Sequence, residues 1–300
     1  MTNPVGRAIR GVPLLGGLLR TSTAERLRWS VQAGQGVRER LRFVAGEMRG
    51  TGAATYTLRS SGLTIEVRHG TRDVYILREI FGMGPASGSY DPPAAVAAAL
   101  EATAAPAVLD LGGNIGLFGA FVLGRWPGAS VHSFEPDPTN FPILERLVAV
   151  NSLAARWTVT PMAVGNAPGE LPFVSGLYAE SQLEGIGQSP DREPDAAVLS
   201  DGTSITVGVV DLFEQDHDVA LMKMDIEGGE WSILTDPRLS ELKADAIVLE
   251  WHAAGCPEPD AREAAIRLLR AARYTGQSET EDFGHRGVIW AWREDGAASA

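Results

Sequence analysis

Residues 107–116 read Ala-Val-Leu-Asp-Leu-Gly-Gly-Asn-Ile-Gly, and this stretch decides the fold. Val108, Leu109 and Leu111 form a short apolar run that predicts a buried strand. The run ends in small residues, and residues 117–123 then predict a helix. A strand, a glycine turn and a helix N-terminus bring backbone N–H groups and the positive end of a helix dipole to one ligand. The stretch therefore predicts a ligand-binding loop.

The spacing of the loop narrows the class of ligand. A dinucleotide fingerprint, Gly-x-Gly-x-x-Gly, would need glycine where this chain has Asn114 and Leu117, so that pattern fails. Glu135 lies 25 residues after Asp110, at the end of a second predicted strand. A carboxylate at that place can accept hydrogen bonds from both hydroxyls of a ribose. A nucleoside ligand is therefore expected, with an ordinary α/β turn as the alternative.

The pattern that is present is Asp110-x-Gly112-x-Asn114-x-Gly116. It resembles motif I of methyltransferases that use S-adenosylmethionine (SAM), with asparagine in place of the middle glycine. The glycines let a ligand approach the backbone, which a Cβ would block.

Composition and charge exclude several classes of protein. The chain has 300 residues and a single cysteine, Cys256, which rules out a disulfide framework or a cysteine metal cluster within the chain and favours a cytoplasmic setting. The net charge is −12, yet the first 50 residues carry nine arginines and three glutamates. The rest of the chain is therefore strongly acidic, and we expect no nucleic-acid partner. The apolar run at 12–19 is too short to span a bilayer, so neither a signal peptide nor stable membrane insertion is expected.

Apolar runs and helical patterns alternate through the second half of the chain. Strands are predicted at 107–111, 130–134, 157–161, 219–224, 246–250 and 287–293, and helices near 114–124, 138–150, 229–235 and 260–272. This alternation predicts an α/β fold with a largely parallel sheet and a ligand outside the carboxyl ends of its strands.

The chain divides into three expected parts: a basic helical segment (1–54), a hairpin with helices that lead into the core (55–104), and the main domain (105–296). The basic segment is expected to be helical over 22–49, with a weak middle at Gly34 and Gly36. It is expected to pack either on the core or on a second subunit of a homo-oligomer. Residues 165–210 interrupt the main domain and suggest a lid or binding loop, with short strands at 171–174 and 205–209.

A second polar stretch follows the predicted strand 219–224. Asp225 stands at the carboxyl end of that strand, and Glu227 and Glu230 fall in the first turn of a helix, where negative charge is favourable. The next predicted strand delivers three further residues to the same edge of the sheet: Glu250, Trp251 and His252.

Several stretches together resemble the FkbM family of SAM-dependent O-methyltransferases: Val108–Gly116, Phe134–Pro136, Met224–Glu230 and Leu249–His252. The likeness extends upstream to Thr71–Phe81 and Tyr90, so it covers roughly residues 55–293. It implies a seven-stranded, Rossmann-like methyltransferase domain behind the helical and hairpin segment. It also implies transfer of a methyl group from SAM to a hydroxyl of a small molecule, such as a secondary metabolite or a sugar.

The resemblance assigns the cofactor site residue by residue. It places the methionine part of SAM along Asp110, Gly112, Gly113, Asn114 and Gly116, and the ribose at Glu135. It places the adenine by Met162 and Ala163, and Tyr90 over the bound SAM.

The chemistry needs a group that removes the proton of the acceptor hydroxyl. His252 is the first candidate for this base, and Asp225 and Glu250 are the next, either as base or by orienting the imidazole. Lys223 is expected on the other face of its strand, and Trp251 either stacks on the acceptor or packs in the core.

Alternatives to this function remain at this stage. Asp225, Glu227 and Glu250 could hold a divalent cation that activates the acceptor, although their spacing requires no metal and no ligand set is assigned. An N-methyltransferase of the same fold, a nucleotide-binding oxidoreductase and a non-catalytic SAM- or nucleotide-binding partner protein are the others.

Overall fold

The computed structural model describes residues 26–81, 88–176, 182–183, 202–215 and 218–294. The apolar run at 12–19 and most of the loop expected within 165–210 lie outside these residues. No helix in the described part of the chain is both long enough and apolar enough to cross a bilayer.

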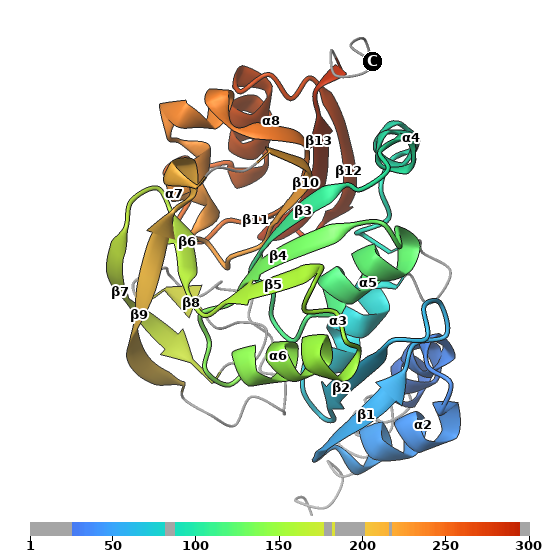
Figure 1. Ribbon diagram of the computed structural model, residues 1–300. Coiled ribbons are helices and arrows are strands. Elements are labelled where there is room, and N and C mark those ends of the chain that lie inside the picture. The colour runs from blue at the N-terminus through green and yellow to red at the C-terminus, as the bar shows by residue number, and fades with distance from the viewer. Residues whose placement is uncertain (1–25, 82–87, 177–181, 184–201, 216–217, 295–300) are drawn as a thin grey trace, which may run out of the picture.

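A seven-stranded sheet forms the centre of the molecule, in the order β12-β13-β11-β10-β3-β4-β5 (Figure 1). Its strands are β3 (Ala107–Leu111), β4 (Ser130–Phe134), β5 (Trp157–Thr160), β10 (Asp218–Met224), β11 (Lys243–His252), β12 (Gly276–Asp282) and β13 (Arg286–Trp292). All pairings from β5 to β11 are parallel, and β13 runs antiparallel to both of its neighbours. The predicted Rossmann-like sheet is therefore confirmed.

The strand order creates a switch point beside β3. The chain runs outward from β3 to β4 and β5, and then crosses to β10 on the other side of β3. Because the connections leave in opposite directions, the carboxyl ends of β3 and β10 border a crevice where ligands bind in open α/β sheets. The two polar stretches of the sequence end at this crevice.

Helices cover both faces of the sheet (Figure 1). On one face lie α3 (Asp73–Ile80), α5 (Leu117–Arg125) and α6 (Phe141–Val150), whose apolar side chains share a core with Val108 and Val131. On the other face lie α7 (Glu230–Leu234) and α8 (Ala261–Ala271), which pack with Leu109 and Leu111. Alternate residues of β3 thus point to opposite cores, which explains its unbroken apolar run.

The segment before the sheet docks on it through the hairpin β1 (Ala53–Thr57) and β2 (Thr64–Arg68). Asn151, at the end of α6, exchanges two hydrogen bonds of 2.8 Å with the backbone of Thr64. Upstream, residues 26–33 are helical and are followed by the 3₁₀ turn η2 (Gly34–Gly36) and by α2 (Arg40–Arg49), so the helix breaks at its glycines as expected. The helix α4 (Ala94–Ala102) leads into β3.

The described part of the region 165–210 belongs to a second sheet rather than to an unstructured loop. It has the order β6-β9-β7-β8, with β6 (Ala163–Gly165), β7 (Gly169–Ser175), β8 (Gln182–Leu183) and β9 (Thr203–Asp211). Ser175 and the backbone of Gly176 donate hydrogen bonds of 2.8 and 3.1 Å to Asp137, in the loop after β4. The small sheet therefore stands at the same edge as the crevice. Two 3₁₀ turns, η4 (Leu212–Glu214) and η5 (Pro237–Glu241), complete the described elements.

Candidate functional site

Backbone hydrogen bonds hold the loop after β3 against the end of β4. The N–H groups of Gly112 and Gly113 donate to the carbonyl of Phe134, at 3.0 and 2.8 Å. Gly112 has φ +81°, and a Cβ there would lie 1.9 Å from the carbonyl oxygen of Asp225. Only glycine fits this position, because the loop after β3 touches the chain after β10. The two polar stretches of the sequence therefore meet directly.

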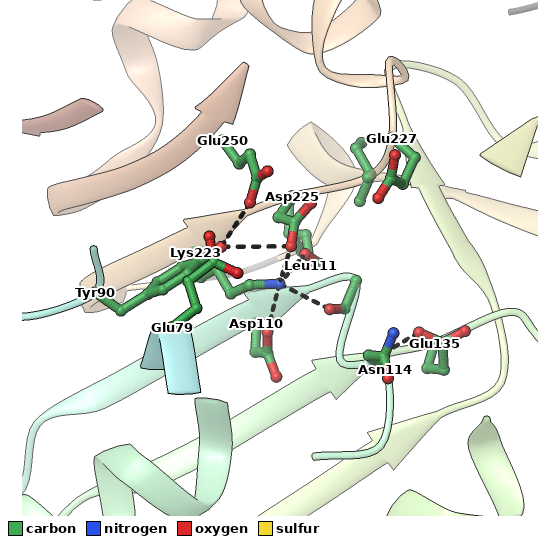
Figure 2. A network of polar contacts seen from close by, with 12 residues as sticks. Glu79, Tyr90, Asp110, Leu111, Asn114, Glu135, Lys223, Asp225, Glu227 and Glu250 are labelled. Carbon is green, nitrogen blue, oxygen red and sulfur yellow. Dashed lines mark hydrogen bonds and ion pairs between the residues drawn. The ribbon is translucent and has the colours of Figure 1, made fainter. Parts of the chain in front are cut away.

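Asn114 and Glu135 join the loop to the end of β4 (Figure 2). The N–H of Asn114, a residue with φ +48°, donates to Oε2 of Glu135 at 2.7 Å, and the N–H of Asp137 donates to Oε1 at 2.9 Å. Burial raises the pKa of Glu135 to about 7 even though these donors oppose the rise. A buried carboxyl beside the loop is what the predicted ribose site requires.

Asp110 is fully buried below the loop, and its side chain contacts other residues of the protein. It accepts a hydrogen bond from the Ser133 hydroxyl at 2.8 Å and pairs with Lys223 at 3.5 Å. Burial raises the pKa of Asp110, while the Lys223 ammonium opposes that rise.

Lys223 lies at the centre of the network, so the expectation that it faces away from the site was wrong. Its Nζ is 3.2 Å from Asp225 and donates to the carbonyl of Gly112 at 2.8 Å (Figure 2). Residues two apart on a strand share a face, so Lys223 and Asp225 point the same way. Burial would lower the pKa of Lys223, but Asp225 and Asp110 outweigh it and raise the pKa above its usual value.

A cluster of carboxylates surrounds His252 at the end of β11. Its Nδ1 lies 3.1 Å from Oε1 of Glu230, which is fully buried, so Nδ1–H donates to that carboxylate. Its Nε2 lies 3.5 Å from Oε2 of Glu227, a residue with φ +54°. Ligand atoms of Asp225, Glu227 and His252 all lie within 4.8 Å of one another.

The pKa values of Glu227 and His252 are both raised, by different causes. Burial raises the pKa of Glu227 to about 8, although the His252 imidazole opposes the rise. Burial alone would lower the pKa of His252, but Glu227 and Glu230 raise it well above its usual value. Glu227 and Glu230 thus stabilise the protonated form of the imidazole.

Glu250 occupies a different position beside the cluster. It accepts a hydrogen bond from the Tyr90 hydroxyl at 3.0 Å and pairs with Arg286, whose position in β13 is opposite His252. Burial acts to raise the pKa of Glu250, but Arg286 and His252 outweigh it and lower the pKa. Tyr90 is buried and also lies 3.5 Å from Asp225. Its contact with bound SAM stays a prediction.

Two functional candidates were missed by the sequence analysis. Arg286 pairs with Glu250 and lies 3.9 Å from Glu79, a buried residue of α3. Burial and the nearby Glu250 raise the pKa of Glu79 well above its usual value. The signal that could have found Arg286 is a charged residue at the start of an otherwise apolar strand.

Trp251, Met162 and Ala163 were the other candidates for contacts with ligands. Trp251 is 1% exposed and packs in the core, so it presents no stacking surface. Met162 and Ala163 lie where the chain enters β6, with the Met162 side chain against Gly208 of β9. Their contact with adenine stays a prediction.

Comparison with protein families decides the assignment. Residues 110–275 match the methyltransferase FkbM domain, which is more than half of the chain. The chain belongs to the FkbM methyltransferase family. This FkbM protein is therefore a SAM-dependent methyltransferase, and its loop after β3 and Glu135 lie where the cofactor of such an enzyme is expected.

Known relatives of this FkbM protein are distant. Over 168 residues it is 27% identical to the 31-O-demethyl-FK506 methyltransferase FkbM of Streptomyces tacrolimicus, which is 46% of this chain and 64% of that one. Over 177 residues it is 25% identical to the methyltransferase sdnD of Sordaria araneosa, which is 50% of this chain and 68% of that one. Among solved structures, a SAM-dependent O-methyltransferase from Thermotoga maritima is 12% identical, with a TM-score of 0.39 over 66% of this chain and 63% of that one. The fold assignment therefore rests on the strand order of the sheet.

Proposed function

We propose that this FkbM protein transfers the methyl group of SAM to a hydroxyl oxygen of a small molecule, in the class of secondary metabolites and sugars. The Streptomyces relative supports the proposal, because its name describes a methyltransferase that acts on 31-O-demethyl-FK506, which places the methyl group on an oxygen. The acidic body of the chain supports a small acceptor over nucleic acid.

One observation carries the proposal: the cofactor loop and the His252 cluster border the same crevice. Gly112 touches the backbone of Asp225, and Lys223 bonds to both sides of that contact. A methyl group held over the loop therefore has the cluster as its neighbour. In-line transfer needs the acceptor oxygen about 3–3.5 Å from the methyl carbon, and such positioning supplies much of the rate.

The cluster is suited to take the proton of the acceptor hydroxyl. Asp225 is engaged by Lys223, and Glu250 is engaged by Tyr90 and Arg286, which leaves His252 with Glu227 as the best-placed pair. With a pKa of about 8, the Glu227 carboxylate is a stronger base than an ordinary carboxylate, and more of it is in the proton-free form as pH rises toward 8. Glu230 fixes the imidazole so that Nε2 faces Glu227. We infer that the acceptor oxygen is activated beside the pair formed by His252 and Glu227.

The test uses methyl-labelled SAM and a panel of hydroxylated sugars and polyketide-like alcohols, with amines of matched skeletons beside them. We expect label in an ether product and release of S-adenosylhomocysteine. The substitution His252→Ala should lower the rate by about 10²-fold or more while SAM still binds.

Each other outcome identifies a different function. Label only in the amines would make the protein an N-methyltransferase. SAM binding without turnover on any acceptor would favour the non-catalytic alternative. An unchanged rate in the His252→Ala variant would remove the histidine from the mechanism.

A further inference from the structure

Three side chains at the crevice are arranged as ligands of one ion. Asp225 follows β10, Glu227 follows two residues later, and His252 ends β11, so two adjacent strands deliver them to one point. Their ligand atoms lie within 4.8 Å of one another, and Nε2 of His252 is 3.5 Å from Oε2 of Glu227. In an octahedral site, adjacent ligands about 2.1 Å from the ion are about 3 Å apart, so a small rotation of the Glu227 side chain brings this pair to the required spacing.

The hydrogen bond on the other side of the imidazole also supports a metal site. Imidazoles that bind metals usually donate their other N–H to a carboxylate, which fixes the tautomer and the ring orientation. Here Glu230 accepts from Nδ1 at 3.1 Å, and its Oε1 also accepts from the N–H of Ile226 at 3.0 Å. Glu230 is itself fully buried, so its position is rigid. Glu230 therefore fixes the imidazole ring with Nε2 toward Glu227.

The charge balance of the cluster also favours a bound cation. Lys223 is shared between Asp110 and Asp225, and Arg286 pairs with Glu250. Within the described ranges, Glu227 and Glu230 form ion pairs with His252 alone. Glu250 also lies 3.8 Å from Nε2 of His252, so three carboxylates share one imidazole at a partly buried site, where unbalanced charge is costly. A divalent ion would balance it.

We propose that Asp225, Glu227 and His252 bind one divalent cation, of the class of Mn²⁺ or Mg²⁺, and that its open positions hold the acceptor hydroxyl. Mixed carboxylate and imidazole ligands suit such ions. The binding of the acceptor hydroxyl at the open positions rests on the proposed function. The bound cation makes the hydroxyl more acidic. The proton leaves to solvent, the oxygen forms its bond to the methyl carbon, and the electron pair of the broken carbon–sulfur bond stays on sulfur.

The test of the site needs neither SAM nor an acceptor. The full chain is treated with EDTA and desalted, and Mn²⁺ is then titrated while free Mn²⁺ is followed by its electron paramagnetic resonance signal. We expect one Mn²⁺ per chain. Dissociation constants should rise at least tenfold in the Glu227→Gln and His252→Ala variants. The control Glu263→Gln, which removes an exposed carboxylate of α8, should bind as the parent does.

Two results would overturn the site: no Mn²⁺ bound at millimolar concentration, or equal affinity in the parent and in folded variants. Circular dichroism and SAM binding confirm that each variant is folded. Methyl transfer to a hydroxyl that survives EDTA, in a protein that binds no Mn²⁺, would remove the site and leave the proposed function. Bound Mn²⁺ without transfer to any hydroxyl would leave the cation site and remove the proposed function.

Discussion

The substitution Gly112→Ala tests the contact between the cofactor loop and the chain after β10. A Cβ at this position would lie 1.9 Å from the carbonyl oxygen of Asp225, and real Cβ contacts stay beyond 3.0 Å. The obstacle is backbone, so the two loops must separate by about 1 Å. The φ of +81° adds about 1–2 kcal/mol of strain for any residue with a side chain.

Gly52 offers a matched control for this substitution. Its φ is +85°, and a Cβ there would meet nothing within 4 Å. Gly52→Ala therefore carries the backbone strain without the collision, and we expect it to cost about 1 kcal/mol in urea unfolding. Gly112→Ala should cost more than the control, and it should also weaken SAM binding and lower methyl transfer by about 10²-fold, the usual effect of a 1 Å misplacement.

Calorimetry with SAM and the release of S-adenosylhomocysteine measure the two functional effects. The reasoning is refuted if Gly112→Ala matches Gly52→Ala in stability, in SAM affinity and in turnover. That result would mean that the loops separate freely and that their contact does not set the geometry of the site.

Two further predictions concern buried charges. Lys223→Met leaves Asp110 buried without its cation and should lower the free energy of unfolding by about 3 kcal/mol. Adding Asp110→Asn to this variant should restore part of the lost free energy. Strictly additive losses from the two substitutions would contradict the coupling between Lys223 and Asp110. Glu135 has a pKa of about 7, so its carboxylate forms as pH rises from 6 to 8 and SAM should bind up to about tenfold tighter. The Glu135→Gln variant should lack this rise, and an identical pH profile would exclude Glu135 as the ribose ligand. Because the pKa of Glu135 in the folded protein lies above its ordinary value of 4.5, the ligand-free protein should lose stability as pH rises from about 4.5 to 7.

The sequence predicted the sheet where apolar runs were bounded by turn residues. The predicted strands at 107–111 and 130–134 coincide with β3 and β4 because each run is buried. β12 was missed, because Gly276–Asp282 reads Gly-Gln-Ser-Glu-Thr-Glu-Asp and lies at the edge of the sheet, where polar side chains are tolerated. The second sheet was also missed as a unit, because its pairing joins strands separated by long stretches of chain.

The sequence predicted the site residues that stand at the ends of strands. It did not predict the residues that pair with them. Asp225 and His252 follow apolar strands, which is a local signal. Arg286 reaches the site only through the antiparallel pairing of β13 with β11, and Glu79 comes from a helix far upstream. Lys223 was misplaced although period-two alternation already put it on the face of Asp225.

A crystal structure with bound S-adenosylhomocysteine tests the central claim most directly. We predict that the ribose hydroxyls lie within hydrogen-bond distance of Glu135, that the amino acid part follows residues 110–116, and that the sulfur faces Asp225 and His252. A ligand bound outside this crevice, or a sulfur turned away from both side chains, would contradict the account.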